Sequence, residues 1–201
     1  MYEFTDKAIE RINRVIQHEF SNMRQTVLAF DEVWVIQNAV NDAYATILRE
    51  VKKIYLECAN DAYRAVTERD TMFTALWIEN FLREYDPVTK YVFAHEFDRK
   101  RARTFEALVA SKRKDISKEI KQAMLSLASQ TKQGADEVTD TATLQGYVDK
   151  GVRRVRWVSE KDGRVCSECR ARDGRTYDIT KVPAKPHIRC RCYLLPTKTL
   201  T

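Results

Sequence analysis

The stretch from residue 33 to residue 66 reads VWVIQNAVNDAYATILREVKKIYLECANDAYRAV. Its apolar residues recur in steps of three and four: Val33, Ile36, Val40, Tyr44, Ile47, Val51, Ile54, Cys58, Ala62 and Val66. At about 3.6 residues per turn, this spacing keeps them on one face over about nine helical turns. No glycine or proline interrupts the stretch. We therefore expect a long amphipathic helix that buries this face against other helices.

A similar apolar series precedes this stretch and covers residues 4–23, with Thr5 or Asp6 as the expected N-cap. Within the long series itself, the position of Cys58 on the apolar face predicts an inert thiol in the core.

Two further helical stretches follow. The first covers residues 73–85 and is expected to end at Asp86-Pro87, because proline disfavours helix in the residue before it. The second covers residues 88–130, with an expected break near Ser111. Residues 1–133 are therefore predicted to form a body of long antiparallel helices.

The pattern changes after the helical region. Residues 134–150 are polar and contain two of the five glycines, which indicates a linker. Residues 152–158 alternate apolar and basic side chains as a strand does, and shorter strands are expected at 176–179 and 190–195. The predicted fold class is mainly α, with a long-helix N-terminal body followed by a small β-containing, zinc-stabilised module at residues 151–201.

Charge is distributed unevenly between these two parts. Residues 1–149 carry 21 Lys+Arg and 24 Asp+Glu, a net charge of −3, whereas residues 150–201 carry 14 Lys+Arg and five Asp+Glu, a net charge of +9. A basic end on a mildly acidic body suggests that the end meets an anionic partner. No apolar run approaches the ~20 residues that cross a bilayer, and no secretory signal pattern opens the chain. We therefore expect a reducing cytosol, where paired cysteines more often bind metal than form disulfides.

Four of the five cysteines lie near the C-terminus. They read Cys166-Ser-Glu-Cys169, followed after seventeen residues by His187-Ile-Arg-Cys190-Arg-Cys192. A Cys-x-x-Cys turn places two thiolates on one side of a cation, and a second cluster folded back on it can complete a tetrahedron. We expect Cys166, Cys169 and Cys190 as ligands of a structural zinc ion, with His187 or Cys192 as the fourth.

The alternative for these cysteines is a small hydrophobic or disulfide-forming cluster. A catalytic zinc is disfavoured, because no His-Glu-x-x-His or His-x-Glu pattern supplies a general base. We expect Trp157 to pack beneath the site. No pair of carboxylates is placed for acid/base catalysis, so the sequence indicates a protein that is not an enzyme.

Residues 150–196 also resemble a known family. Their motifs are, in order, Val-Arg-Trp-Val, Asp162, Cys-x-x-Cys, Asp173-Gly174 with Tyr177, and Pro-His-x-x-Cys-Arg-Cys. The order of these motifs resembles the C-terminal domain of phage Mu F-like minor head proteins, also called head morphogenesis proteins. One departure is that Pro186 precedes His187, where the family has proline directly after the histidine.

The resemblance implies a phage minor capsid protein that is structural rather than enzymatic. It implies assembly in the host cytoplasm, a location inside the head of the virion, and partners that include the portal protein and capsid or scaffold proteins. Members of the family are also thought to contact packaged double-stranded DNA.

The arginines of the basic end could contact phosphates without reading sequence, because the guanidinium fork suits phosphate oxygens. The candidates are Arg153, Arg154, Arg156, Arg164, Arg170, Arg172, Arg175, Arg189 and Arg191. The alternative is a solvated surface, or one that matches an acidic protein. Two other functions remain open: a zinc-ribbon nucleic-acid-binding regulator, and, as the weakest, a metal-dependent nuclease that uses His187.

Overall fold

The computed structural model describes residues 3–69, 73–84, 92–111, 114–161, 163–187 and 190–197. The body contains the helices α1 (Glu3–Ala29), α2 (Val33–Thr67), α3 (Ala75–Arg83), α4 (Phe93–Ala110) and α5 (Ile116–Asp149). The C-terminal part contains β1 (Arg154–Val158), α6 (Ser167–Arg172), β2 (Thr176–Asp178), the 3-10 turn η1 (Ile179–Lys181) and β3 (Tyr193–Pro196). The mainly helical fold with a small C-terminal sheet confirms the predicted class.

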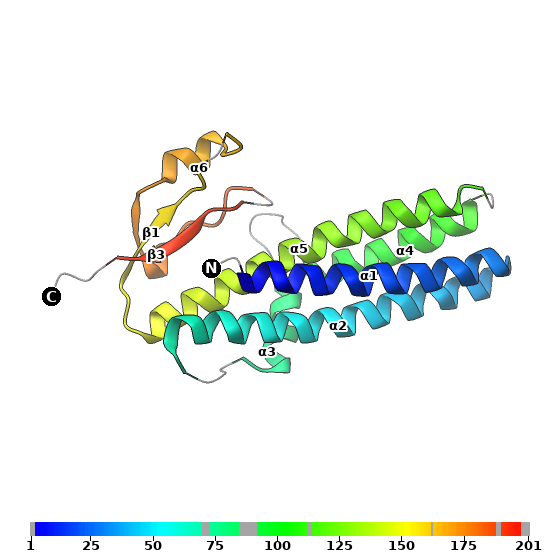
Figure 1. Ribbon diagram of the computed structural model, residues 1–201, viewed down its shortest axis with the longest axis horizontal. Helices are drawn as coiled ribbons and strands as arrows, with labels where there is room; N and C mark the ends of the chain where they lie inside the picture. The colour runs from blue at the N-terminus through cyan, green and yellow to red at the C-terminus, as the bar shows by residue number, and fades with distance from the viewer. Residues whose placement is uncertain are drawn as a thin grey trace.

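The long helices form two antiparallel hairpins, α1 with α2 and α4 with α5, that pack side by side (Figure 1). Helix α2 lies centrally, in contact with α1, α4 and α5. Its predicted apolar face is the core, since Val40, Ile47 and Val51 are completely buried. The two ends of that series depart from the pattern, because Val33 is 53% exposed and Val66 is only partly buried.

The helix ends differ in part from the expectations. Helix α1 already includes Glu3, so neither Thr5 nor Asp6 is its N-cap, and Thr5 is instead buried with its Oγ1 2.8 Å from Thr139 Oγ1 of α5. The expected break near Ser111 is confirmed, because Ser111 is the C-cap of α4. The expected stop at Asp86-Pro87 lies outside the described residues.

The predicted linker at residues 134–150 is wrong, because α5 continues without interruption to Asp149. The two glycines in it serve close helix packing rather than flexibility. A Cβ atom on Gly134 would overlap the Tyr55 hydroxyl oxygen, and one on Gly146 would lie 3.0 Å from Val66 Cβ.

The polar character of this segment was equally misleading. Thr139 is buried, and its hydroxyl donates to the carbonyl oxygen of Ala135, one turn earlier in the same helix; Thr131, just before the segment, bonds to Leu127 O in the same way. Threonine hydroxyls that bond to their own helix can enter a core without a separate partner. Residues 134–149 therefore belong to the helical body.

Gly151 ends α5. Its φ of 73° is in the left-handed region. The N–H of Gly151 donates to Val148 O at 2.9 Å, and the N–H of Val152 donates to Tyr147 O at 3.0 Å. This pair of bonds is the Schellman termination, which favours glycine at that position. The chain thus passes from the helix into β1 within a few residues.

The C-terminal sheet is antiparallel with the strand order β2-β1-β3. The expected alternation in β1 is confirmed, with Val155 and Trp157 buried and Arg154 and Arg156 exposed. The last strand begins at Tyr193 rather than at residue 190, so Cys190 and Cys192 lie in the segment before it. None of the described helices is long and apolar enough to cross a membrane.

We expect Gly134→Ala to destabilise the body by about 1–3 kcal/mol, because the added methyl must displace the buried, hydrogen-bonded Tyr55 ring. The sign of the change in the free energy of unfolding is diagnostic, since a glycine-to-alanine change at an open helical site stabilises by about 1 kcal/mol. Urea unfolding followed by circular dichroism measures it. Gly163→Ala is the control, because the space that its added methyl would occupy is open to a distance of 4 Å. A stability of Gly134→Ala equal to or above that of the wild type would contradict the close packing.

Candidate metal centre

The first pair of candidate donors lies at the start of α6. Cys166 is the N-cap of this helix, and its Sγ accepts a hydrogen bond from the backbone N–H of Cys169 at 3.3 Å. Cys169 lies one turn into the helix with a side chain that is almost fully buried. The Cys-x-x-Cys spacing therefore turns both sulfur atoms toward the same side, as expected for a metal-binding turn.

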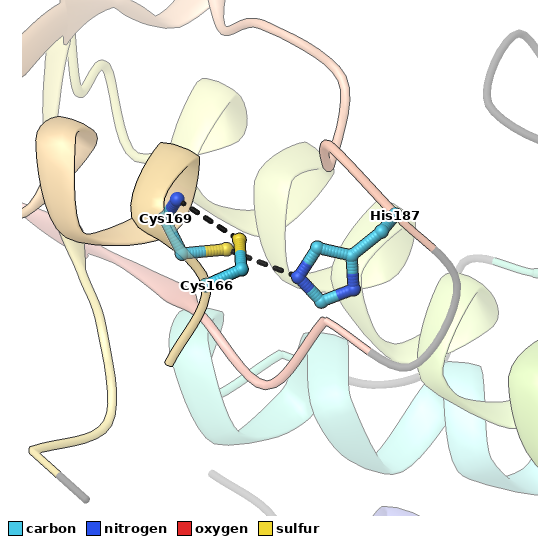
Figure 2. Close-up of side chains that lie close together, drawn as sticks. All are labelled: Cys166, Cys169 and His187. Carbon is cyan, nitrogen blue, oxygen red and sulfur yellow. Dashed lines mark hydrogen bonds between the residues drawn. The ribbon is translucent and has the colours of Figure 1, made fainter. Parts of the chain in front are cut away.

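The second cluster reaches Cys169 from the segment before β3. His187 Nε2 lies 3.4 Å from Cys169 Sγ, and Cys190 Sγ lies 3.5 Å from the same sulfur atom. Figure 2 shows the imidazole of His187 turned toward the Cys166–Cys169 pair. The structure thus brings together two parts of the chain that are far apart in sequence.

All five predicted donors take part, in two overlapping groups. The donor atoms of Cys166, Cys169 and His187 lie within 4.8 Å of one another, and so do those of Cys169, Cys190 and Cys192. Cys169 belongs to both groups. All five cysteines of the chain, the distant Cys58 included, are free thiols.

The distances from Cys169 to two of the other donors fit neighbouring ligands of one metal ion. With Zn–S bonds of about 2.3 Å and Zn–N bonds of about 2.0 Å, two ligand atoms of a tetrahedron lie about 3.5–3.8 Å apart. The distances from Cys169 Sγ to Cys190 Sγ and to His187 Nε2 are close to this range. Cys166, Cys169 and Cys190 with either His187 or Cys192 would supply four donors. The cluster is therefore compatible with a metal site.

Burial controls the protonation of these thiols. It raises the pKa of Cys169 and of Cys190, because the thiolate form loses its hydration there. The pKa of Cys166 is lowered, chiefly because the backbone N–H of Cys169 stabilises the thiolate. A bound cation would supply the positive charge that lets the buried thiols deprotonate as well.

Trp157 forms the base of the cluster, as predicted. It is 2% exposed and packs in one small core with Cys169, Cys190 and Cys192. The Tyr177 ring packs edge to face against the Trp157 ring, with 6.3 Å between the ring centres. The Arg172 guanidinium lies over the Trp157 ring, 5.2 Å from its centre. This core contains few large apolar side chains, so its packing alone offers little stability.

The predicted phosphate-contacting arginines fall into three groups. Most are exposed, namely Arg153, Arg154, Arg156, Arg164, Arg170, Arg175 and Arg191. Arg172 is different, because it covers Trp157, donates to Ala184 O and pairs with Glu168, which gives it a packing role inside the module. Arg189 lies outside the described residues. DNA contact by the exposed arginines stays a prediction.

A partly buried ion pair at the seam between module and body was not found from the sequence. Lys185 pairs with Asp140 of α5, and the hydroxyl of Tyr147 donates to Leu194 O at 3.4 Å. Burial alone would lower the pKa of Lys185, but the charge and hydrogen bond of Asp140, together with the charges of Cys190 and Asp136, outweigh it and the pKa is raised. Asp136 precedes Asp140 by one helical turn, so both carboxylates lie on the same face of the helix. This spacing was the signal in the sequence that could have indicated a site for a cation such as Lys185.

No family model, no curated protein sequence and no solved structure matches the chain. The metal centre and the seam are therefore interpreted from their own chemistry.

Loss of a metal ion held by this cluster is expected to unfold the module and spare the helices. Cys166→Ser, or chelation of the wild type, removes a cross-link that contributes about 10–16 kcal/mol in small zinc domains. Limited proteolysis with mass spectrometry should then show cleavage confined to residues 150–201. Trp157 emission should shift to the red as the ring meets water.

Cys58→Ser is the matched control, because Cys58 is buried in the body and belongs to neither donor group. It should keep the metal content of the wild type. Equal protease resistance of the C-terminal region in Cys166→Ser and the wild type would count against a metal-held module.

The seam predicts a pH dependence. Burial raises the pKa of Asp136 from 3.8 to about 6, and Asp140 adds to this while Lys185 and Lys132 oppose it. A raised pKa means that the folded state binds this proton more tightly. The carboxyl therefore stabilises the fold below pH 3.8, and that contribution is lost as the pH rises through about 6.

We expect Asp136→Asn to be more stable than the wild type by about 1–3 kcal/mol near neutral pH, because the amide carries no charge to bury. This difference in the free energy of unfolding should disappear at about pH 4, where the wild-type carboxyl is protonated in the folded state. Urea unfolding across this range measures the difference. The exposed Glu106→Gln should stay within about 0.5 kcal/mol of the wild type throughout. A difference for Asp136→Asn that does not change with pH would contradict the assignment.

Proposed function

We propose that this chain is a non-enzymatic minor head protein of a phage, whose C-terminal module is held together by a structural zinc ion. The observation that carries the proposal is the convergence of the other four predicted donors on Cys169. These are the cysteines and the histidine on which the resemblance to head morphogenesis proteins rests. The rest of that resemblance, including the portal, capsid or scaffold partners and the location inside the head, comes from the sequence.

Zinc is the metal we propose, because thiolate and imidazole ligands together favour it over magnesium or calcium. A structural rather than catalytic role follows from the number of donors. Four of the five suffice for a closed tetrahedron, which leaves no position for a reacting water. The carboxylate in α6, Glu168, is paired with Arg172 and supplies no free general base beside the cluster.

The module also presents a cationic surface. Arg154 and Arg156 project from β1 on the side opposite the buried Val155 and Trp157. Such side chains could hold packaged DNA through its phosphates without sequence preference. The same surface supports the second candidate, a zinc-ribbon protein that regulates by binding nucleic acid.

The deciding experiment is an affinity pull-down of the tagged chain from cells that produce the phage or carry the prophage, after nuclease treatment. Recovery of portal, capsid or scaffold protein is expected. The tagged Cys166→Ser variant should lose partners that the module holds, whereas Cys58→Ser should keep them. Recovery of host transcription proteins alone would overturn the head role and favour the regulator.

DNA affinity as a function of salt tests the cationic surface separately. Replacing Arg154 and Arg156 with alanine should weaken binding and reduce the slope of log K against log salt by about 0.9 for each lost phosphate contact. The control changes Arg14 and Arg83, which are exposed on the helical body. An equal loss in both double variants would show that charge alone, and not the strand surface, is responsible.

A further inference from the structure

The connection between α1 and α2 carries apolar side chains that the fold does not bury. It lies at the end of the body opposite the C-terminal module (Figure 1). Phe30, Val33 and Trp34 are 51%, 53% and 66% exposed. Burying a side chain of this size stabilises by about 1.5–3 kcal/mol, so three exposed together indicate a surface used for binding.

A groove of about 490 Å³ runs between the two helices beside these residues. We call it the tip groove. Its apolar lining includes Met23, Phe30 and Trp34, and its acidic lining consists of Glu19, Glu32 and Asp42. From Trp34 to Ala43, it follows α2 for about 14 Å, at 1.5 Å per residue.

The charge of the tip groove has one sign. None of its lining residues, all in the described part of the chain, is a lysine or an arginine. Arg24 of α1 turns away and donates to Ser117 Oγ of α5 at 3.0 Å. Glu19 is only 20% exposed, with His18 Nε2 3.9 Å from its carboxylate. Three carboxylates thus surround an aromatic surface without a basic side chain in the lining to balance them.

We propose that the tip groove binds a basic amphipathic helix of a partner protein. Apolar side chains of that helix would pack between the exposed Phe30 and Trp34 side chains, in the way that an amphipathic helix fills an apolar groove. Its arginines or lysines would pair with Glu19, Glu32 and Asp42. An arginine could also stack on the exposed Trp34 ring, since a cation over an indole face is attracted to it. This site is independent of the zinc module and of the head role.

The test begins with selection of a displayed library of random peptides against the immobilised full chain. Selected peptides should combine arginine or lysine with apolar residues at helical spacing. Their affinity, measured by fluorescence anisotropy, should fall about tenfold or more in Trp34→Ala. A similar loss is expected when Glu19, Glu32 and Asp42 are replaced by their amides. Circular dichroism checks that the helices remain folded.

The matched control replaces Glu10, Glu84 and Glu106 with glutamine, which makes the same change in net charge at exposed positions elsewhere. Equal weakening in both triple variants would overturn the proposal in favour of general charge attraction. Selected peptides without basic residues, or peptides indifferent to Trp34→Ala, would also overturn it. A second copy of this chain is the last alternative occupant of the tip groove, and sedimentation of the chain alone tests it. A dimer that forms in the wild type and is lost in Trp34→Ala would show that a second copy occupies the groove and would overturn the proposal.

Discussion

Helix α5 approaches α2 so closely at Gly134 that a side chain there would overlap the Tyr55 hydroxyl. Tyr55 is completely buried, and its hydroxyl donates to Thr131 O of α5 at 2.5 Å. Because Gly134 has no side chain, α5 can pack directly against the Tyr55 ring of α2, and the Tyr55 hydroxyl can bond to the α5 backbone. A second close approach, of Gly146 to Val66, continues the contact toward the end of the helix. Because of both, α5 stays packed up to the point where the C-terminal module begins.

The module depends on that position in turn. It has a core of one tryptophan and three cysteines, too small to be stable through apolar burial alone. Two features compensate. The donor cluster around Cys169 can be cross-linked by a metal, and the Lys185–Asp140 pair ties the module to α5. The ion pair forms only because α5 remains helical and buried past Gly134.

Sequence periodicity was sufficient to predict the long helices, because nearly every member of the apolar series in α2 faces the core. The clustering of the four C-terminal cysteines with His187 was also predictable, since residue type and spacing express the geometry directly. The linker prediction failed because buried threonines and close-approach glycines have the composition of a loop. Asp136, Asp140 and Lys185 were missed for a related reason: in the sequence they look like ordinary surface charges, and only tertiary packing buries them. The exposed Trp34 was hidden inside a helical series in which most apolar residues are core.

The bond between Thr5 and Thr139 joins residues separated by 134 positions. Contacts of such long range form late in folding, because the intervening chain must first be ordered. During synthesis, α1 and α2 can pair as soon as both are made, but the face of α1 that meets α5 has no partner until most of the chain exists. The body can therefore close before the last candidate donor, Cys192, has been made. A chain that stops before Thr139 would therefore leave the first helix only half covered.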